Sequence, residues 1–538
     1  MPGGIVMADE FLPSVLIKDA DFGRIIESLC NELSPPLDAS RLANSLKRLR
    51  NMFVLSFELR KMAVNNNLQL RLLELLRSTE LSQNSEFRTE CFLVLAQLHR
   101  SNLLNEENFP MQPSEFLSFI GTNLFAKGCD EKSVTAGLLS LLHHCSTDPS
   151  FLLSINEHTQ KSWLSTVLEL IRKDENDMET NFKPNALLID YVLKVVAQGC
   201  RSDPVVREQC GQFDFLIKTL EEQLIGGRSL ESRISSIDCI ASLCTDNPKN
   251  AAMISKRNKI VPCLSSLTDR NCHLRLQLNA LKCLVRICAN GKGEAPTKRA
   301  INTCQNLVRL SKSDRPMNIR IEAVESLVEL TEGSIGLQRI AGQCDNLIGI
   351  ASSVLASQEQ VHCPVSSKKG QENMALDLDT QKTPALISDC VTGPFLEMLA
   401  TITSNDEHIR RRVSDNQHLI SAIVASVRHA NPRPVVLAGL HCLLSMSRSS
   451  FQLRTTFADH RNQLATMLTD ICKHQSNDEE MLTSCLALIA NLLLPYGPVK
   501  NVLIGNKPEE FIKMLVSFSN HSNHQVRINA LWSLIVSS

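Results

Sequence analysis

The feature that most constrains this chain is an apolar helical pattern that recurs along it at a nearly constant interval. In each copy one apolar residue lies at the centre of the apolar stripe, and we call this residue the anchor. Eight of the ten spacings between successive anchors lie between 43 and 46 residues. A fixed period of this length is typical of proteins built from stacked helical repeats. The eleven anchors are Leu49, Leu95, Leu141, Val196, Ile240, Leu284, Leu327, Leu399, Leu443, Ile489 and Leu534.

A small residue precedes most anchors by four positions. Residues i and i+4 lie on one face of a helix. A small side chain there therefore lets a neighbouring helix approach closely while the anchor fills the core. Val192 and Phe395 are the two larger residues at this position. The small residues are Ser45, Cys91, Gly137, Ser236, Ala280, Ala323, Gly439, Cys485 and Ala530.

Proline marks the end of the anchor helix in three copies. Pro149, Pro204 and Pro248 each lie eight residues after an anchor. Proline cannot continue a helix, so the anchor helix ends before it, and a nearby Asp or Thr can cap the helix that follows. At the start of the first copy, Asp38 is a predicted N-cap.

These patterns predict an all-α fold, an armadillo-type α-solenoid wound as a right-handed superhelix of about eleven repeats. The third helix of each repeat would line a long concave groove. We expect residues 1–37 to be partly disordered, 38–356 to form a first block of repeats, and 357–384 to be a mobile insertion loop. Residues 385–538 would form a second block that ends without an evident cap. A shorter polar insertion is expected at Lys173–Pro184.

Composition argues against several classes of partner. The net charge of -1 offers no basic field for nucleic acid. No apolar run approaches the ~20 residues of a membrane span, so membrane insertion is not expected. Nineteen cysteines, an odd number, indicate a reduced compartment, and we expect the cytoplasm and nucleus. The cluster Arg410-Arg411-Arg412 is interpreted as a solvated helix face.

No pattern in the sequence predicts catalysis. The pairs Cys239/Cys244 and Cys283/Cys288 are separated by the repeat length, and structural zinc sites usually use closer pairs. They are interpreted as core cysteines. His143 lies at the predicted end of a helix, where the helix dipole favours histidine. Phosphate-loop, hydrolase and metalloprotease motifs are missing. We therefore expect no enzyme activity, no cofactor, no metal and no small-molecule substrate.

Partner binding is expected along a row of polar residues two positions after the anchors, which we call the polar row. One such side chain per repeat would line the groove and hydrogen-bond an extended peptide. Any solvated helix face would give the same pattern, so both interpretations stand. The candidate groove residues are Gln97, His143, Gln198, Arg286, Glu329 and Asn491, together with Trp532, whose indole would either anchor a partner or pack within the repeats. The other polar-row members are Asn51, Ser242, Thr401 and Ser445.

The last repeat is expected to expose apolar surface. Leu531, Leu534, Ile535 and Val536 belong to its third helix. Terminal repeats of a solenoid need a polar outer face for solubility, and no following segment supplies one in this sequence. We expect an apolar patch larger than the few hundred Å² of a typical monomer.

Six segments carry a family resemblance. They are Ser85–Arg100, Leu276–Cys288, Arg320–Ile348, Ser404–Val413, Ala438–His460 and Val526–Ile535. These segments resemble, in order along the chain, the armadillo repeat-containing protein 8 family, the armadillo scaffold of the GID/CTLH ubiquitin ligase. The stretch Leu440–His460 is specific to that family, whereas R-x-N-A-L-W near the end is general to armadillo repeats.

The resemblance implies a noncatalytic scaffold subunit that links the ligase core, with its CTLH and RING subunits, to a substrate receptor for proteasomal degradation. Family members usually continue for several more repeats. The alternative is an armadillo adaptor in nuclear import or in vesicle or adhesion complexes. An import adaptor of the importin-α type needs W-x-x-x-N on successive third helices. Only Trp532 fits this motif, and Val536 replaces its asparagine.

Overall fold

The computed structural model describes fourteen ranges of the chain, and every regular element within them is an α-helix. The prediction of an all-α solenoid is therefore confirmed. Residues 1–37, Lys173–Pro184, positions 360–383 of the expected insertion, Pro149 and His143 lie outside the described residues. The ranges are 38–77, 84–100, 135–141, 163–171, 186–227, 229–288, 296–344, 346–359, 384–428, 430–449, 455–474, 478–494, 499–505 and 508–537.

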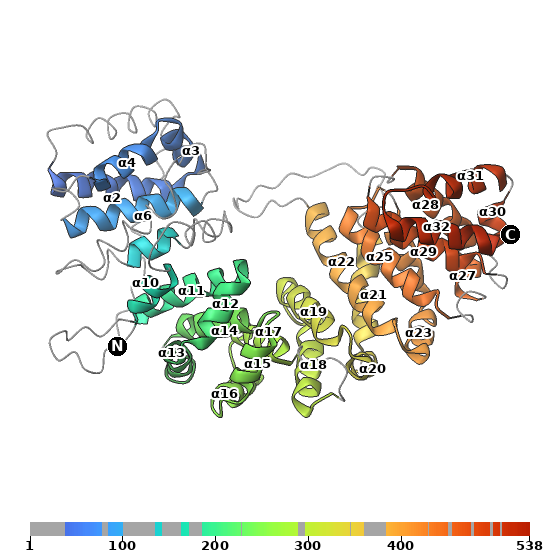
Figure 1. Ribbon diagram of the computed structural model, residues 1–538, viewed down its shortest axis with the longest axis horizontal. Helices are drawn as coiled ribbons and strands as arrows, with labels where there is room; N and C mark the ends of the chain where they lie inside the picture. Colours follow the sequence, from blue (N-terminus) through green and yellow to red (C-terminus); the bar gives the residue numbers. More distant parts are fainter. Residues whose placement is uncertain are drawn as a thin grey trace, which may run out of the picture. The chain divides into compact units, whose positions relative to one another are not determined.

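The chain divides into two compact units, residues 1–250 and 251–538, whose helices can be followed in Figure 1. In both units the helices that carry the anchors contact one another, and we call them spine helices. In the first unit α2 (Ala39–Leu55) packs on α6 (Ser85–Arg100), and α11 (Ala186–Ser202) packs on α14 (Leu230–Cys244). In the second unit each spine helix packs on the next, in the order α17 (Leu274–Cys288), α19 (Met317–Thr331), α22 (Pro384–Thr403), α25 (Arg433–Met446), α29 (Glu479–Leu492) and α32 (His524–Ser537).

Shorter helices connect and cover the spine helices, and we call them flanking helices. None of the described helices is long and apolar enough to cross a bilayer. In the first unit the flanking helices are α3 (Phe57–Asn65), α4 (Leu68–Arg77), α10 (Trp163–Glu169), α12 (Pro204–Gln212) and α13 (Asp214–Gly226), and α15 (Pro248–Ser255) spans the unit boundary. In the second unit they are α16 (Ile260–Leu267), α18 (Lys298–Leu310), α20 (Ile335–Gln343), α21 (Leu347–Glu359), α23 (Glu407–Ser414), α24 (Gln417–Ser426), α27 (Thr456–Asp459), α28 (Arg461–His474), α30 (Lys500–Ile504) and α31 (Pro508–Phe518).

The anchors and the small residues before them form the core, as the sequence predicts. Ten of the eleven anchors are buried, and Leu534 is partly buried. All nine small residues are buried as well. Gly439 illustrates the close approach, because a Cβ added there would lie 2.2 Å from the Oγ of Ser426 on α24. The small residue is thus required by the distance between packed helices.

Two predicted helix starts are also confirmed. The Asp38 carboxylate accepts a hydrogen bond of 3.0 Å from the Ser40 amide at the start of α2. At the start of α12, Asp203 accepts one of 2.7 Å from the Val205 amide, next to Pro204 in the first turn. Each carboxylate satisfies an amide that the helix itself leaves without a partner.

A buried small residue on a spine helix should not tolerate a larger one. Ala280 is fully buried on α17, so Ala280→Leu should overpack a helix crossing and destabilise the second unit by about 1–3 kcal/mol. The same change at the exposed Ala252 is the matched control. Urea unfolding followed by circular dichroism measures both. Equal midpoints for the two variants would show that the repeat register is wrong.

Side chains just after the spine helices satisfy the last carbonyl groups of those helices. In five spine helices a polar side chain donates a hydrogen bond to the carbonyl oxygen seven residues earlier, in the last helical turn, and we call these side chains corner caps. Helix C-terminal carbonyls have no intrahelical donor and need such partners. The bonds join Arg60 to Phe53 (2.8 Å), Arg207 to Cys200 (2.9 Å), Asn250 to Leu243 (3.0 Å), Gln338 to Thr331 (3.2 Å) and Arg410 to Thr403 (2.8 Å).

The corner cap Arg410 donates side-chain hydrogen bonds to three residues. Its guanidinium donates to the carbonyl oxygens of Thr403 (2.8 Å) and Ser404 (2.9 Å) and pairs with the Glu407 carboxylate at 3.0 Å. Only 9% of Arg410 is exposed. The interpretation of its arginine cluster as a solvated face is therefore wrong for Arg410, although the neighbouring Arg411 is exposed. Its position at the turn after α22 explains the burial.

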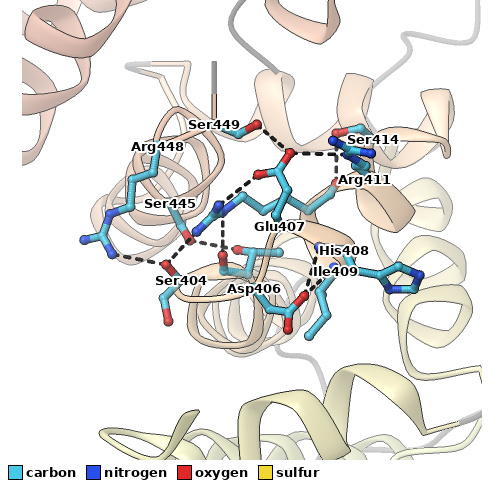
Figure 2. Close-up of polar contacts among 12 residues, drawn as sticks. Ser404, Asp406, Glu407, His408, Ile409, Arg411, Ser414, Ser445, Arg448 and Ser449 are labelled. Atoms are coloured by element: carbon cyan, nitrogen blue, oxygen red, sulfur yellow. Dashed lines mark hydrogen bonds and ion pairs between the residues drawn. The ribbon is translucent and has the colours of Figure 1, made fainter. Parts of the chain in front are cut away.

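Glu407 extends this network to the next spine helix. Besides Arg410, its carboxylate accepts a hydrogen bond of 2.8 Å from the Ser449 hydroxyl, which follows α25 (Figure 2). The hydroxyls of Thr403 and Ser445 lie 2.9 Å apart beside it. Asp406 caps α23 by accepting from the amides of His408 and Ile409. The ends of α22 and α25 are thus joined by polar bonds as well as by the apolar core.

Removing the Arg410 side chain should destabilise the second unit strongly. Arg410→Ala leaves the Thr403 carbonyl oxygen without its side-chain donor, whereas the Ser404 carbonyl oxygen still accepts a hydrogen bond of 3.3 Å from Arg448, so we expect a cost of about 1–3 kcal/mol. Arg411→Ala is the matched control, because this exposed arginine pairs with the same Glu407 at 3.4 Å and should cost about 0.5 kcal/mol or less. Thermal unfolding of the two variants checks this, and a cost for Arg410→Ala as small as that for Arg411→Ala would contradict it.

Candidate protein-binding surface

The predicted groove residues lie on successive spine helices. Gln97 on α6 and Gln198 on α11 are partly buried in the first unit. In the second unit Arg286, Glu329 and Asn491 lie on α17, α19 and α29, and are partly buried as well. His143 lies outside the described residues, and whether a partner contacts the row stays a prediction. Trp532 lies on α32 and is 54% exposed.

Polar-row residues bond to the neighbouring repeat, a role that the sequence reasoning did not identify. Arg286 forms an ion pair of 2.9 Å with Glu329 of the next repeat. Asn491 donates a hydrogen bond of 2.8 Å to the hydroxyl of Ser447, which follows the preceding spine helix. Ser242 and Ser445, expected to line the groove, are buried. The row therefore ties adjacent spine helices together, and only part of it is available to a partner.

Charged residues two or five positions before the anchors connect the spine helices further. Lys282 on α17 pairs with Glu322 on α19. His441 on α25 lies 2.8 Å from the Glu397 carboxylate on α22. Hydrogen bonding to Glu397 raises the pKa of His441, with a smaller contribution from Glu480 on α29, although burial opposes it. Opposite charges on adjacent helices thus compensate each other along this surface.

The His441 contact should make the stability of the second unit depend on pH. Because the folded pKa lies above the unfolded one, the stabilisation is complete below about pH 6.5, the ordinary histidine value. It is lost as pH rises through the folded pKa. We therefore expect His441→Gln to lower the melting temperature more at pH about 6.5 than about two units higher. A difference from wild type that is the same at both pH values would contradict the assignment.

The second unit carries a concentration of exposed apolar side chains on α31 and α32. Of the fourteen large apolar residues that are exposed in the described ranges, six lie on these two helices. On α32 they follow the spacing i, i+3, i+4, i+7, which places them on one helix face. The expected apolar exposure is thus present at Leu531 and Ile535, while Leu534 and Val536 are partly buried. We call Ile512, Val516, Ile528, Leu531, Trp532 and Ile535 the apolar surface.

The residues at the equivalent positions of other repeats show what kind of contact the exposed face of α32 resembles. Leu531 lies three residues before its anchor, and Leu440 on α25 and Leu486 on α29 lie at the same position in their repeats. Both of those leucines are fully buried where spine helices stack. The exposed face of α32 therefore has the chemistry and spacing of a helix-packing surface.

Of the four cysteines interpreted as core residues, Cys239, Cys244 and Cys283 are buried and Cys288 is partly buried. Cys239 and Cys283 are fully buried, each one position before an anchor. Burial raises the pKa of the Cys239 thiol well above its ordinary value and that of Cys244 to about 12. Burial thus favours the protonated form of both thiols. Within the described residues no group of three or more histidine, cysteine or acidic side chains is arranged to hold a metal ion.

Comparisons with known proteins identify relatives of one kind. No family model matches the chain. Armadillo repeat-containing protein 8 of Danio rerio is 24% identical over 485 residues, and that of Xenopus laevis is 24% identical over 518 residues. Each alignment covers 86% of this chain but only 64% and 66% of those relatives. GID complex subunit 5 of Schizosaccharomyces pombe is 27% identical over 192 residues, which is 35% of this chain and 21% of that protein.

One solved structure resembles the chain at low identity. An engineered protein of known crystal structure aligns with 96% of this chain and 98% of its own, at 12% identity and a TM-score of 0.49. The curated relatives confirm the resemblance that the six sequence segments indicate. The chain is an all-α helical repeat protein that resembles armadillo repeat-containing protein 8 along most of its length.

Proposed function

We propose that this chain is a noncatalytic scaffold subunit of a GID/CTLH-type E3 ubiquitin ligase. In this role it links the CTLH- and RING-containing ligase core to a substrate receptor, and the substrates are degraded by the proteasome. The observation that carries the proposal is the similarity to armadillo repeat-containing protein 8 over 86% of the chain. The name of the yeast relative, a GID complex subunit, supports the same assignment.

The repeat architecture supports a scaffold role. A stack of spine helices offers a long surface for protein contacts, and such surfaces are what helical repeat proteins use for binding. Ubiquitin transfer would be carried out by the RING-bearing partners, so this chain would need no catalytic group. We further propose that the protein acts in the cytoplasm and nucleus, since its many buried thiols suit a reducing compartment.

The apolar surface on α31 and α32 is the contact that we assign to a protein partner in this complex. Interface centres are enriched in tryptophan and other large apolar residues, and Trp532 lies within this surface. The polar-row residues Gln97, Gln198 and Asn491 are proposed as further contacts in the groove. A helix from a core subunit would match the spacing of the exposed residues on α32.

Affinity purification from cells, followed by mass spectrometry, tests this function. The tagged chain should recover RING- and CTLH-containing subunits. A double variant, Trp532→Ala with Ile535→Asp, should reduce their recovery by about tenfold or more, because an anchor residue typically contributes 2 kcal/mol or more. Val205→Asp is the matched control, since Val205 is an isolated exposed apolar residue on α12.

Recovery of a different set of proteins with the tagged chain would indicate one of the alternative functions. Recovery of nuclear-import carriers alone would favour an import adaptor, and recovery of membrane-traffic or adhesion proteins alone would favour a scaffold in those complexes. Either result would overturn the ligase assignment. Equal loss of ligase subunits from the double variant and from Val205→Asp would leave the ligase assignment in place but remove the apolar surface from it.

A further inference from the structure

We propose that a basic trough between α16 and α18 binds an extended acidic segment of a partner protein. The trough has a volume of about 650 Å³ and lies wholly within the second unit. Five of its lining side chains are basic, and none is acidic. The basic residues are Arg270, Lys298, Arg299, Arg309 and Lys312. This proposal concerns a different surface from the one assigned above and does not depend on ligase membership.

Among the described residues no carboxylate forms an ion pair with these five basic side chains, although Asp269 lies close enough to Arg309 to act on its charge. Nearby ion pairs join Lys282 to Glu322 and Arg315 to Asp314. Elsewhere along the spine, opposite charges on adjacent helices compensate each other. An uncompensated group of cations in a concave site favours an anionic ligand.

Arg309 is one of the side chains that line the trough. Its guanidinium donates to the Thr268 carbonyl oxygen (2.9 Å) and to the Gln277 side chain (3.1 Å), which fixes its position. Its Nε is buried and has no hydrogen-bond partner. Burial and the nearby Arg270 and Arg315 lower the pKa of Arg309, although Asp269 opposes this. Positive charges thus lie close together around Arg309, and a ligand carboxylate bound there would reduce the repulsion between them.

The shape of the trough favours a peptide over a compact anion. Lys298, Asn302, Asn306 and Arg309 line it along one face of α18. From Lys298 to Arg309 this face extends about 16 Å, at 1.5 Å per residue. That length matches about five residues of extended chain at 3.3 Å each. Amide side chains between the cations offer hydrogen bonds to the peptide backbone, so the site suits alternating backbone and carboxylate contacts.

Fluorescence anisotropy with the full chain tests the proposal. The probe is a labelled Gly-Ser peptide that carries about five consecutive glutamates, and its counterpart has glutamine at the same positions. We expect the glutamate peptide to bind more tightly. The double variant Lys298→Glu with Lys312→Glu should weaken binding by about fivefold or more, because each exposed ionic contact contributes modestly. Both lysines are exposed, so the fold should persist.

A second charge reversal distinguishes a site from general attraction. Lys473→Glu with Lys513→Glu makes the same change in net charge at exposed positions on α28 and α31 and should leave affinity unchanged. Equal weakening by both double variants, or equal affinity for the glutamate and glutamine peptides, would overturn the proposal. Binding of inositol hexakisphosphate that the trough variant abolishes, without binding of the glutamate peptide, would overturn it in favour of a small polyphosphate.

Discussion

The stacking of spine helices on one another is the interaction on which the rest of the structure depends. Ten of the eleven anchors are buried, nine of the eleven follow a small residue one turn earlier, and this pairing sets how closely adjacent helices approach. The apolar core of the second unit runs without interruption from Leu278 to Ala530. Because each helix packs mainly on its neighbours, a substitution should be felt locally first. The surfaces available to partners are whatever this stacking leaves exposed.

The corner caps supply hydrogen-bond donors to carbonyl groups that the stacking of helices buries. A spine helix that ends in the core leaves carbonyl groups buried, and a buried carbonyl without a donor is costly. Arg207, Asn250, Gln338 and Arg410 supply the donor from the first turn of the following helix. These hydrogen bonds explain why the four polar side chains are buried.

The sequence predicted the apolar part of the fold well and the polar part less well. Anchors, small residues and the caps Asp38 and Asp203 follow from helical spacing and local chemistry. The prediction for Arg410 was wrong, because the spacing of residues along one helix does not reveal that the Arg410 side chain bonds to the end of the preceding helix. A signal was present, since Arg60, Arg207, Gln338 and Arg410 each lie eleven residues after an anchor. The partners of the polar row and the trough beside Arg309 depend on packing between helices distant in sequence, which the period alone does not give.

The spine helices should be the most stable part of each unit, and the flanking helices should be less stable. Hydrogen–deuterium exchange of the full chain, read by mass spectrometry, tests this most directly because it reports local stability helix by helix. Peptides from α22 and α25 should exchange most slowly, and peptides from the flanking helices α23 and α27 should exchange faster. If those flanking helices were protected longer than α22 and α25, the stacking of spine helices would not be what holds the repeats together.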